Sequence, residues 1–307
     1  MKKTLLILFG LVAFVPAAFS QVTLEIKHHE KTTVKTQHIL KSSSTTQVAG
    51  QEPALKYSAD MIAEFAAGAR AADGTLRAKT TFKTLTFKME GDGNVLVEFD
   101  SADPDRKAAI AELEEVLEFL RVASKLQSTY VFNKDGSVKT VEFPDDTGRD
   151  FPEPLKKALK SEIWTGKRKH QYEMLPDKAV SEGDTWTRDQ EVRLGGFREM
   201  TFRIDFQYEG TVKKDGRELD RISGKITDVA YTGEDWREGP GLVKNAELKP
   251  AKSSVEALFD RKLGRFVETK LLVQVKGDLT LEAGDKEMPA KVDITFEQGM
   301  KVLPQEK

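Results

Sequence analysis

The chain has 307 residues, with 50 acidic side chains against 48 Lys and Arg, a formal net charge of −2 and no cysteine. This charge balance argues against a nucleic-acid or an anionic-membrane partner. The absence of cysteine excludes disulfides, thiolate metal sites and a lipid-anchored N-terminal cysteine. A chain of this length can bury a sizeable core without such cross-links.

The N-terminus has the pattern of a secretory signal peptide. Two lysines precede an apolar run over residues 5–15, and the small residues Ala18 and Ser20 follow at the positions expected before a cleavage site. The run is too short to span a membrane. We therefore predict that residues 1–20 are removed. The mature protein, from Gln21, is then exported to the periplasm or the medium and has no transmembrane anchor.

Residues 21–170 are predicted to form an N-terminal β-rich half. Alternating apolar and polar residues over 22–47 predict one or two strands with one solvated face. Residues 76–89 and 95–99 alternate in the same way around a Gly-Asp-Gly-Asn turn and predict a hairpin. Residues 55–70 are ambiguous, because their alanines favour a helix. The Asp-Gly turn that follows favours a hairpin strand, and we expect a strand.

A long helix is predicted over residues 104–126, because Asp103 can cap it and Pro104 suits its first position. Glutamates occupy its polar side. Its apolar stripe has helical spacing and consists of Ile110, Leu113, Leu117 and Leu120. Such a stripe is most often core. If the stripe did not fill the space against a curved sheet, the same residues would line a site for an apolar ligand.

A second hairpin is predicted around Asp135 and Gly136, within the phrase F-x-x-D-G-x-V-x-x-V-E. Asp-Gly between alternating apolar residues is a strong hairpin signal. Asn133 and Glu142 also fit positions of a calcium-binding loop. Val131 occupies the first ligand position of that loop, however, so the hairpin turn is the favoured interpretation.

The phrase L-P-x-x-x-V-x-x-G-D-T-W occupies residues 175–186. Pro176 prevents a regular element from running through it. Gly183 and Asp184 form a turn pair, and Trp186 opens a run with strand alternation. We predict that this stretch is the structural joint between two halves of the protein, with Trp186 buried in it.

These two phrases, and a short leucine-rich helix predicted between them over residues 152–163, carry a resemblance. The middle third of the chain resembles secreted bacterial proteins of uncharacterised function that are common in planctomycete-type genomes. The shared motifs are structural. The resemblance implies an envelope protein and supplies no substrate.

Residues 171–307 are predicted to form a C-terminal β-rich half. Its expected strands lie near residues 187–193, 197–208, 218–231, 251–260, 265–276, 279–283 and 291–296. A long loop is expected over residues 233–250, and its Trp236 is a candidate for an exposed ligand contact. The predicted fold class is α+β, with predominantly antiparallel curved sheet packed on one long and one short helix. Whether the two halves are related repeats stays open.

No catalytic signature is present: the chain lacks a nucleophile elbow, a P-loop and a dinucleotide-binding fingerprint. Its four histidines are scattered or adjacent on an expected strand, which does not suit a metal. We therefore predict a non-enzymatic protein without cofactor or metal.

Two functions remain. The first is a structural or protein-interaction module of the envelope, which would dock through sheet edges and the basic run at residues 167–169. The second is a periplasmic carrier that holds an apolar or lipidic ligand between the curved sheet and the helix. Its ligand would contact the apolar stripe of the helix and Trp236. A deep apolar cavity would favour the carrier.

Overall fold

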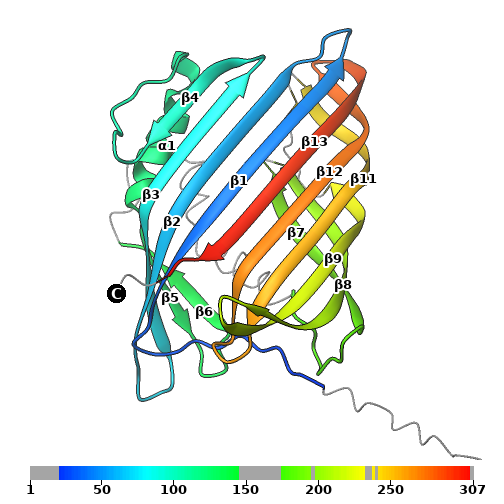
Figure 1. Ribbon diagram of the computed structural model, residues 1–307. Helices are drawn as coiled ribbons and strands as arrows, with labels where there is room; N and C mark the ends of the chain where they lie inside the picture. Colours follow the sequence, from blue (N-terminus) through cyan, green and yellow to red (C-terminus); the bar gives the residue numbers. More distant parts are fainter. Residues whose placement is uncertain (1–20, 145–173, 195–197, 232–236, 239–240, 305–307) are drawn as a thin grey trace, which may run out of the picture.

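The computed structural model describes residues 21–144, 174–194, 198–231, 237–238 and 241–304. Within them, thirteen strands form a single sheet in which every neighbouring pair is antiparallel. Figure 1 shows that this sheet is strongly curved. The predicted class, dominated by antiparallel curved sheet, is confirmed.

The strands of the first half are β1 (Thr33–Val48), β2 (Ala54–Arg70), β3 (Leu76–Gly91), β4 (Asn94–Asp100), β5 (Gln127–Phe132) and β6 (Val138–Glu142). Those of the second half are β7 (Thr185–Leu194), β8 (Arg198–Lys214), β9 (Arg217–Tyr231), β10 (Arg237–Glu238), β11 (Gly241–Asp260), β12 (Arg265–Ala283) and β13 (Lys286–Val302).

The sheet order is β6-β5-β3-β2-β1-β13-β12-β11-β9-β8-β7, with β4 beside β3 and β10 beside β11. Strands of the first half thus form one block and those of the second half another. The blocks meet where β1 pairs with β13 along a ladder that runs from Thr36 opposite Val302 to Val48 opposite Ala290. The stretch at residues 175–186, predicted as the joint, leads instead into β7 at the far edge of the sheet.

The ambiguous stretch at residues 55–70 is a strand, as expected. Its alanines do not form a helix because β1 and β3 pair with it on both sides along almost its whole length. Strand pairing of this kind overrides a local helix preference. Residues 22–32, predicted as strand, form no ladder: only Val22 makes an isolated bridge, with Val180.

The long helix predicted over residues 104–126 is wrong in its length. A 3₁₀ turn (Ala111–Leu113) and one helix, α1 (Glu114–Lys125), are formed. The preceding residues instead run as an irregular segment beside β4, tied to the helix by Arg121. Its guanidinium donates hydrogen bonds to the carbonyl oxygens of Pro104 and Arg106 at 2.9 and 2.7 Å. These contacts use the carbonyls that a longer helix would need.

In the second half, most strand positions are confirmed and two expectations are corrected. The described residues of the predicted loop at 233–250 belong to β10 and β11, which pair with each other, and β11 also pairs with β12. The two strands expected at residues 265–276 and 279–283 are one continuous strand, because Gly277 stays extended within the ladder. The predicted short helix at residues 152–163 lies outside the described residues.

Buried side chains form three clusters. The largest gathers residues of β8, β9, β11, β12 and β13. A second joins β2, β3, β5 and β6, and a third joins α1 to β3 and β4. We call the face of the sheet on which α1 packs the inner face, and the opposite one the outer face. No helix among the described residues is long and apolar enough to cross a membrane.

Candidate functional site

Strand register decides which side chains share a face. Directly opposite residues of an antiparallel pair lie on the same face, and successive residues of one strand alternate between faces. Four rows cross the middle of the inner face from β3 or β4 to β12. They are Leu85, Met61, His38, Met300 and Thr269; Phe99, Phe87, Ala59, Leu40, Gln298 and Leu271; Val97, Met89, Tyr57, Ser42, Phe296 and Val273; and Gly91, Leu55, Ser44, Ile294 and Val275.

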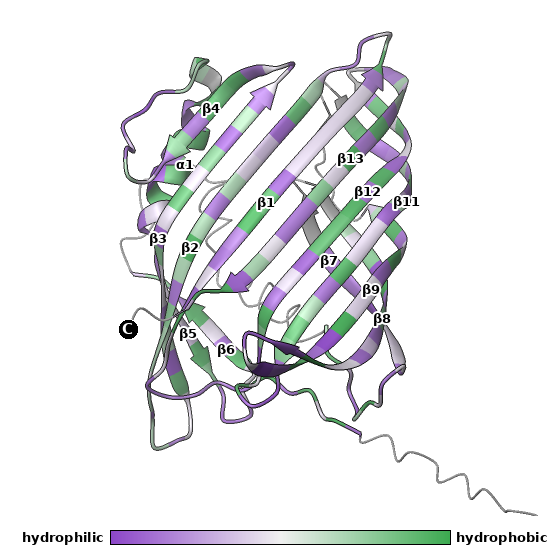
Figure 2. Ribbon diagram, in the orientation of Figure 1, coloured by the Kyte–Doolittle hydropathy of each residue, from purple (hydrophilic) through white to green (hydrophobic). Residues whose placement is uncertain are grey.

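None of the residues in these four rows is Asp, Glu, Lys or Arg, and His38 is the one histidine. Most outer positions of the same strands are polar or charged, with Ile39, Ile62 and Leu272 as apolar exceptions, and several of the polar ones pair across the strands. The ammonium of Lys276 lies 2.8 Å from Asp293, and Gln37 donates to both oxygens of Asp60 at 3.0 and 2.8 Å. Figure 2 shows the resulting alternation of hydrophilic and hydrophobic bands along these strands.

Between the largest cluster and the α1 cluster, the rows pass over side chains that are only half-buried. We call this set the central strip; it consists of Leu40, Tyr57, Ala59, Met61, Phe87 and Met89. Leu40 packs at the border of the largest cluster, whereas Met61, Phe87 and Met89 pack at the border of the α1 cluster. The central strip is therefore a continuous apolar surface that joins two cores without being sealed by either.

The central strip combines rigid and adaptable groups. The rings of Tyr57 and Phe87 stack with centroids 6.4 Å apart and an interplanar angle of 21°. Methionine side chains are unbranched and polarisable, so they adapt to irregular apolar shapes. Ala59 leaves the middle of the strip with little side-chain volume. Such a surface can hold a hydrocarbon by contact, and it contains no acid–base pair for chemistry.

Two of the residues predicted to bind a ligand prove to be core. Leu117 and Leu120 are buried against Leu85, Val97 and Phe99, so they fill the space between helix and sheet. Leu113 is half-buried at the border of that cluster. Ile110 precedes the 3₁₀ turn and is 45% exposed. Trp236 lies outside the described residues, as does the basic run at residues 167–169. For the apolar stripe of the helix and for Trp236, ligand binding stays a prediction.

The predicted joint is a tight turn at the start of β7. Gly183 has φ +90°, which a glycine adopts without strain. The carboxylate of Asp184 accepts a hydrogen bond from the backbone of Ser181 at 2.8 Å. Trp186 stacks on Phe206 at 5.7 Å, and its indole donates to the carbonyl of Met174 at 3.1 Å. Trp186 is half-buried beside the largest cluster, rather than fully buried.

Pro176 is half-buried and directly follows Leu175, a member of the largest cluster. The hairpin predicted around Asp135 and Gly136 is confirmed, because β5 and β6 pair on either side of it. The carboxylate of Asp135 accepts hydrogen bonds from the backbone and the hydroxyl of Ser137, which lower its pKa. It therefore caps the turn.

A buried ionic cluster lies where the β8–β9 and β11–β12 hairpins meet. The Asp220 side chain is 2% exposed and accepts hydrogen bonds from the Tyr208 hydroxyl at 2.7 Å and from Nε of Arg261 at 2.9 Å. Burial raises the pKa of Tyr208, and the hydrogen bond to Asp220 raises that of Arg261. These groups bond to one another and link two hairpins, so we assign them to stability.

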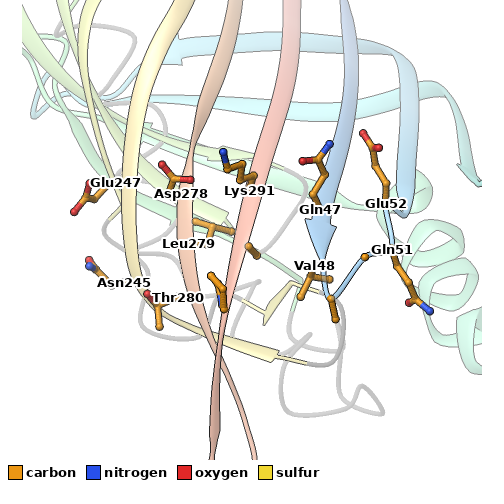
Figure 3. A pocket seen from close by; sticks show the side chains of 14 residues that line it. Gln47, Val48, Gln51, Glu52, Asn245, Glu247, Asp278, Leu279, Thr280 and Lys291 are labelled. Carbon is orange, nitrogen blue, oxygen red and sulfur yellow. The ribbon is translucent and has the colours of Figure 1, made fainter.

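A hollow of about 740 Å³ lies where β1, β11, β12 and β13 approach one end of the sheet (Figure 3). The side chains across it include Glu247, Asp278, Lys291 and Gln47, which occupy one row of directly opposite residues. This lining mixes charged side chains of both signs with apolar residues such as Val48 and Leu279, so it lacks the predominantly apolar character of a typical buried ligand site. Among the described residues, no three His, Asp or Glu side chains are placed to hold a metal ion.

No protein-family model matches the chain, and no curated protein sequence matches it. Three solved structures are similar in part. A lipovitellin structure on lipid–protein interactions has 10% identity and a TM-score of 0.46; the match covers 92% of this chain but only 26% of the lipovitellin chain.

The translocator domain of the autotransporter NalP from Neisseria meningitidis has 10% identity and a TM-score of 0.20, and the match covers 89% of this chain and 90% of that domain. A putative outer membrane lipoprotein-sorting protein domain from Vibrio parahaemolyticus has 6% identity and a TM-score of 0.14, with 88% and 87% covered. All three TM-scores are below 0.5, so we base no functional argument on these likenesses.

Proposed function

We propose that this protein is an exported, non-enzymatic carrier that holds an apolar or lipidic chain against the inner face of its sheet. The observation that carries the proposal is the central strip, an apolar surface left half-buried between two well-packed cores. Apolar side chains gain about 25 cal/mol for each Å² removed from water. A bound hydrocarbon would supply that gain where the protein's own residues do not.

The distribution of charge supports the same proposal. The solvated face of an antiparallel sheet is usually polar. A sheet with water on both sides would therefore carry polar residues on both faces. Here the outer face has the exposed ion pairs, such as Lys41 with Glu297 at 4.0 Å, and the inner rows have none among their residues. The protein therefore separates a water-facing side from a side suited to an apolar occupant.

Export is part of the proposal and rests on the signal-peptide pattern of residues 1–20. We expect the secreted protein to begin at Gln21 when expressed in a bacterial host. N-terminal sequencing or intact mass of the extracytoplasmic fraction measures this. Retention of Met1 in the exported fraction, or recovery of all the protein from the cytoplasm, would contradict the proposal of export.

Replacing Ala59 by tryptophan is expected to block the carrier. The indole would occupy the middle of the central strip, where Leu40 and Phe87 are its direct neighbours across the strands. We expect binding of the uncharged dye N-phenyl-1-naphthylamine to weaken at least tenfold, which corresponds to about 1.4 kcal/mol. Fluorescence titration of protein purified without detergent measures the change, and native mass spectrometry detects any co-purified lipid.

Ser58→Trp is the matched control, because Ser58 is the preceding residue of β2 and lies on the outer face opposite Lys41 and Lys88. It should bind the dye as the wild type does. Circular dichroism establishes that both variants fold. Ala59→Leu serves as a smaller block if the tryptophan disturbs β2. The proposal fails if the wild type binds no dye and carries no lipid. It also fails if Ala59→Trp and Ser58→Trp weaken dye binding equally.

A second function, docking of another envelope protein, is favoured by the edges of the sheet. Within the described residues β7 forms a ladder only with β8, and β6 only with β5. Edge strands of this kind can accept a strand from another chain. Cross-linking in an envelope extract, with a proline substituted at Asp189 in the middle of β7, tests it. An unchanged pattern of cross-linked partners would argue against docking through this edge.

A further inference from the structure

We infer that the occupant of the central strip is a neutral lipid bearing an alcohol, ester or ketone oxygen, rather than an ionised fatty acid or a phospholipid headgroup. This inference rests on the carrier function proposed above and names the chemical class of its ligand. Two features carry it: the distribution of charged residues, and a row of hydroxyl side chains on β1.

The first feature is that the inner rows offer no counter-charge. An ionised carboxylate or phosphate removed from water needs a cationic partner or several hydrogen bonds, since its desolvation costs several kcal/mol. No lysine or arginine occupies the four inner rows. Outside these rows, Arg188 of β7 occupies an inner position opposite Ile204 and pairs with Asp177 at 2.9 Å, and Arg261, in the turn after β11, pairs with Asp220. An anionic headgroup therefore has no partner along the central strip.

The second feature is a run of hydroxyl side chains at successive inner positions of β1. Ser42, Ser44 and Thr46 are all less than 7% exposed, and they stand directly opposite Phe296, Ile294 and Val292 of β13. On the other side, Ser42 lies opposite Tyr57 of the central strip. Hydroxyls both donate and accept hydrogen bonds. They can thus form hydrogen bonds with a neutral oxygen of a lipid, and no ion pair is needed.

Hydroxyl side chains occupy both faces of β1 over residues 42–46, but only Ser42, Ser44 and Thr46 stand opposite apolar residues of the inner face. Placing polar groups within an apolar wall is unfavourable unless they find hydrogen-bond partners. The neighbouring inner positions of β13 and β12 are apolar throughout this part of the sheet: Phe296, Ile294, Val292, Val273 and Val275. Ser43 and Thr45 occupy the outer positions of the same strand, so they provide matched controls with the same chemistry on the opposite face.

The test compares ligands that share one hydrocarbon chain. N-Phenyl-1-naphthylamine bound to the full mature protein is displaced with oleyl alcohol, methyl oleate or oleate at pH 8, where the carboxylate of oleate is ionised. We expect the alcohol and the ester to displace the dye at concentrations at least tenfold lower than oleate. If oleate displaces the dye at the same concentration as oleyl alcohol, the inference is overturned while the carrier function stands.

The double variant Ser42→Ala with Ser44→Ala tests the hydroxyl row. It should keep dye binding and lose most of the preference for the alcohol over oleate. The control pair, Ser43→Ala with Thr45→Val, should retain that preference. An unchanged preference in the inner-face variant would overturn the role of the hydroxyls. A wild-type protein that binds no dye and carries no lipid would overturn the proposed carrier function and this inference with it, which is a different result from the oleate outcome.

Discussion

Arg261→Ala is expected to destabilise the protein by about 3 kcal/mol, because it leaves a buried carboxylate without its cation. The Asp220 side chain is 2% exposed and receives two hydrogen bonds from Arg261. Removing one partner of a buried ion pair typically costs 3–5 kcal/mol. Arg261 itself is 41% exposed and the Tyr208 hydroxyl still donates to Asp220, so the lower end of that range applies. Equilibrium unfolding in urea measures the loss.

Two further variants identify the cause of that loss. Arg203→Ala breaks an exposed ion pair with Asp189, in which both side chains are more than half exposed, and should cost less than about 1 kcal/mol. Adding Asp220→Asn to Arg261→Ala removes the orphaned charge and should recover part of the stability. A single Arg261→Ala variant that unfolds within 1 kcal/mol of the wild type would show that the cluster is not a stabilising link between the hairpins.

Gly277→Ala is expected to cost about 2–4 kcal/mol through backbone crowding. A Cβ at this position of β12 would lie 2.1 Å from the carbonyl oxygen of Glu247 and 2.9 Å from the Cα of Leu248. Both are backbone atoms of the neighbouring strand β11, so no side-chain rotation can relieve the contact. The two strands must separate locally, and faster hydrogen exchange of their amides should accompany the loss of stability.

Gly299→Ala is the matched control, since Gly299 lies in the neighbouring strand β13 and neither glycine has a positive φ. Its added Cβ would find only the carbonyl of Thr269, at 3.9 Å. An alanine in a strand is about 0.5–1 kcal/mol better than glycine when space permits. We therefore expect no loss, or a small gain. Equal unfolding midpoints for Gly277→Ala and the wild type would refute the close approach of β11 and β12.

The candidate site could be predicted only in part. The alternation over residues 76–89 placed Phe87 and Met89 on one face of a strand, which the structure confirms. Tyr57, Ala59 and Met61 could not be assigned to that face, because the alanine-rich stretch around them fits a helix as well as a strand. The register that joins all five residues comes from pairing with β1 and β3. No local pattern contains that information.

For helix α1, the sequence predicted the buried residues correctly but not the start of the helix. Its apolar spacing located the buried residues Leu117 and Leu120 correctly, since periodicity depends only on neighbours within a few turns. The start of the helix was predicted too early, because Asp103 and Pro104 have the chemistry of a helix start. The backbone of Asp103 instead closes a tight turn onto Asp100 at 2.9 Å. Contacts of Arg121, seventeen residues along the chain from Pro104, then hold the preceding segment in its irregular path.

Local alternation in the sequence was sufficient to predict that strands dominate, where most of them lie and, in clearly alternating stretches such as residues 76–89, which residues share a face, because the period of two is a local property of an extended chain. The Asp-Gly pairs at residues 73–74, 92–93 and 135–136 likewise predicted three of the hairpin turns. The tertiary structure decided that β1 pairs with β13, which brings Thr36 opposite Val302. Partners so far apart in the chain are selected by the total burial and hydrogen bonding of the whole sheet. The central strip and the ionic cluster of Asp220 exist only because of that selection.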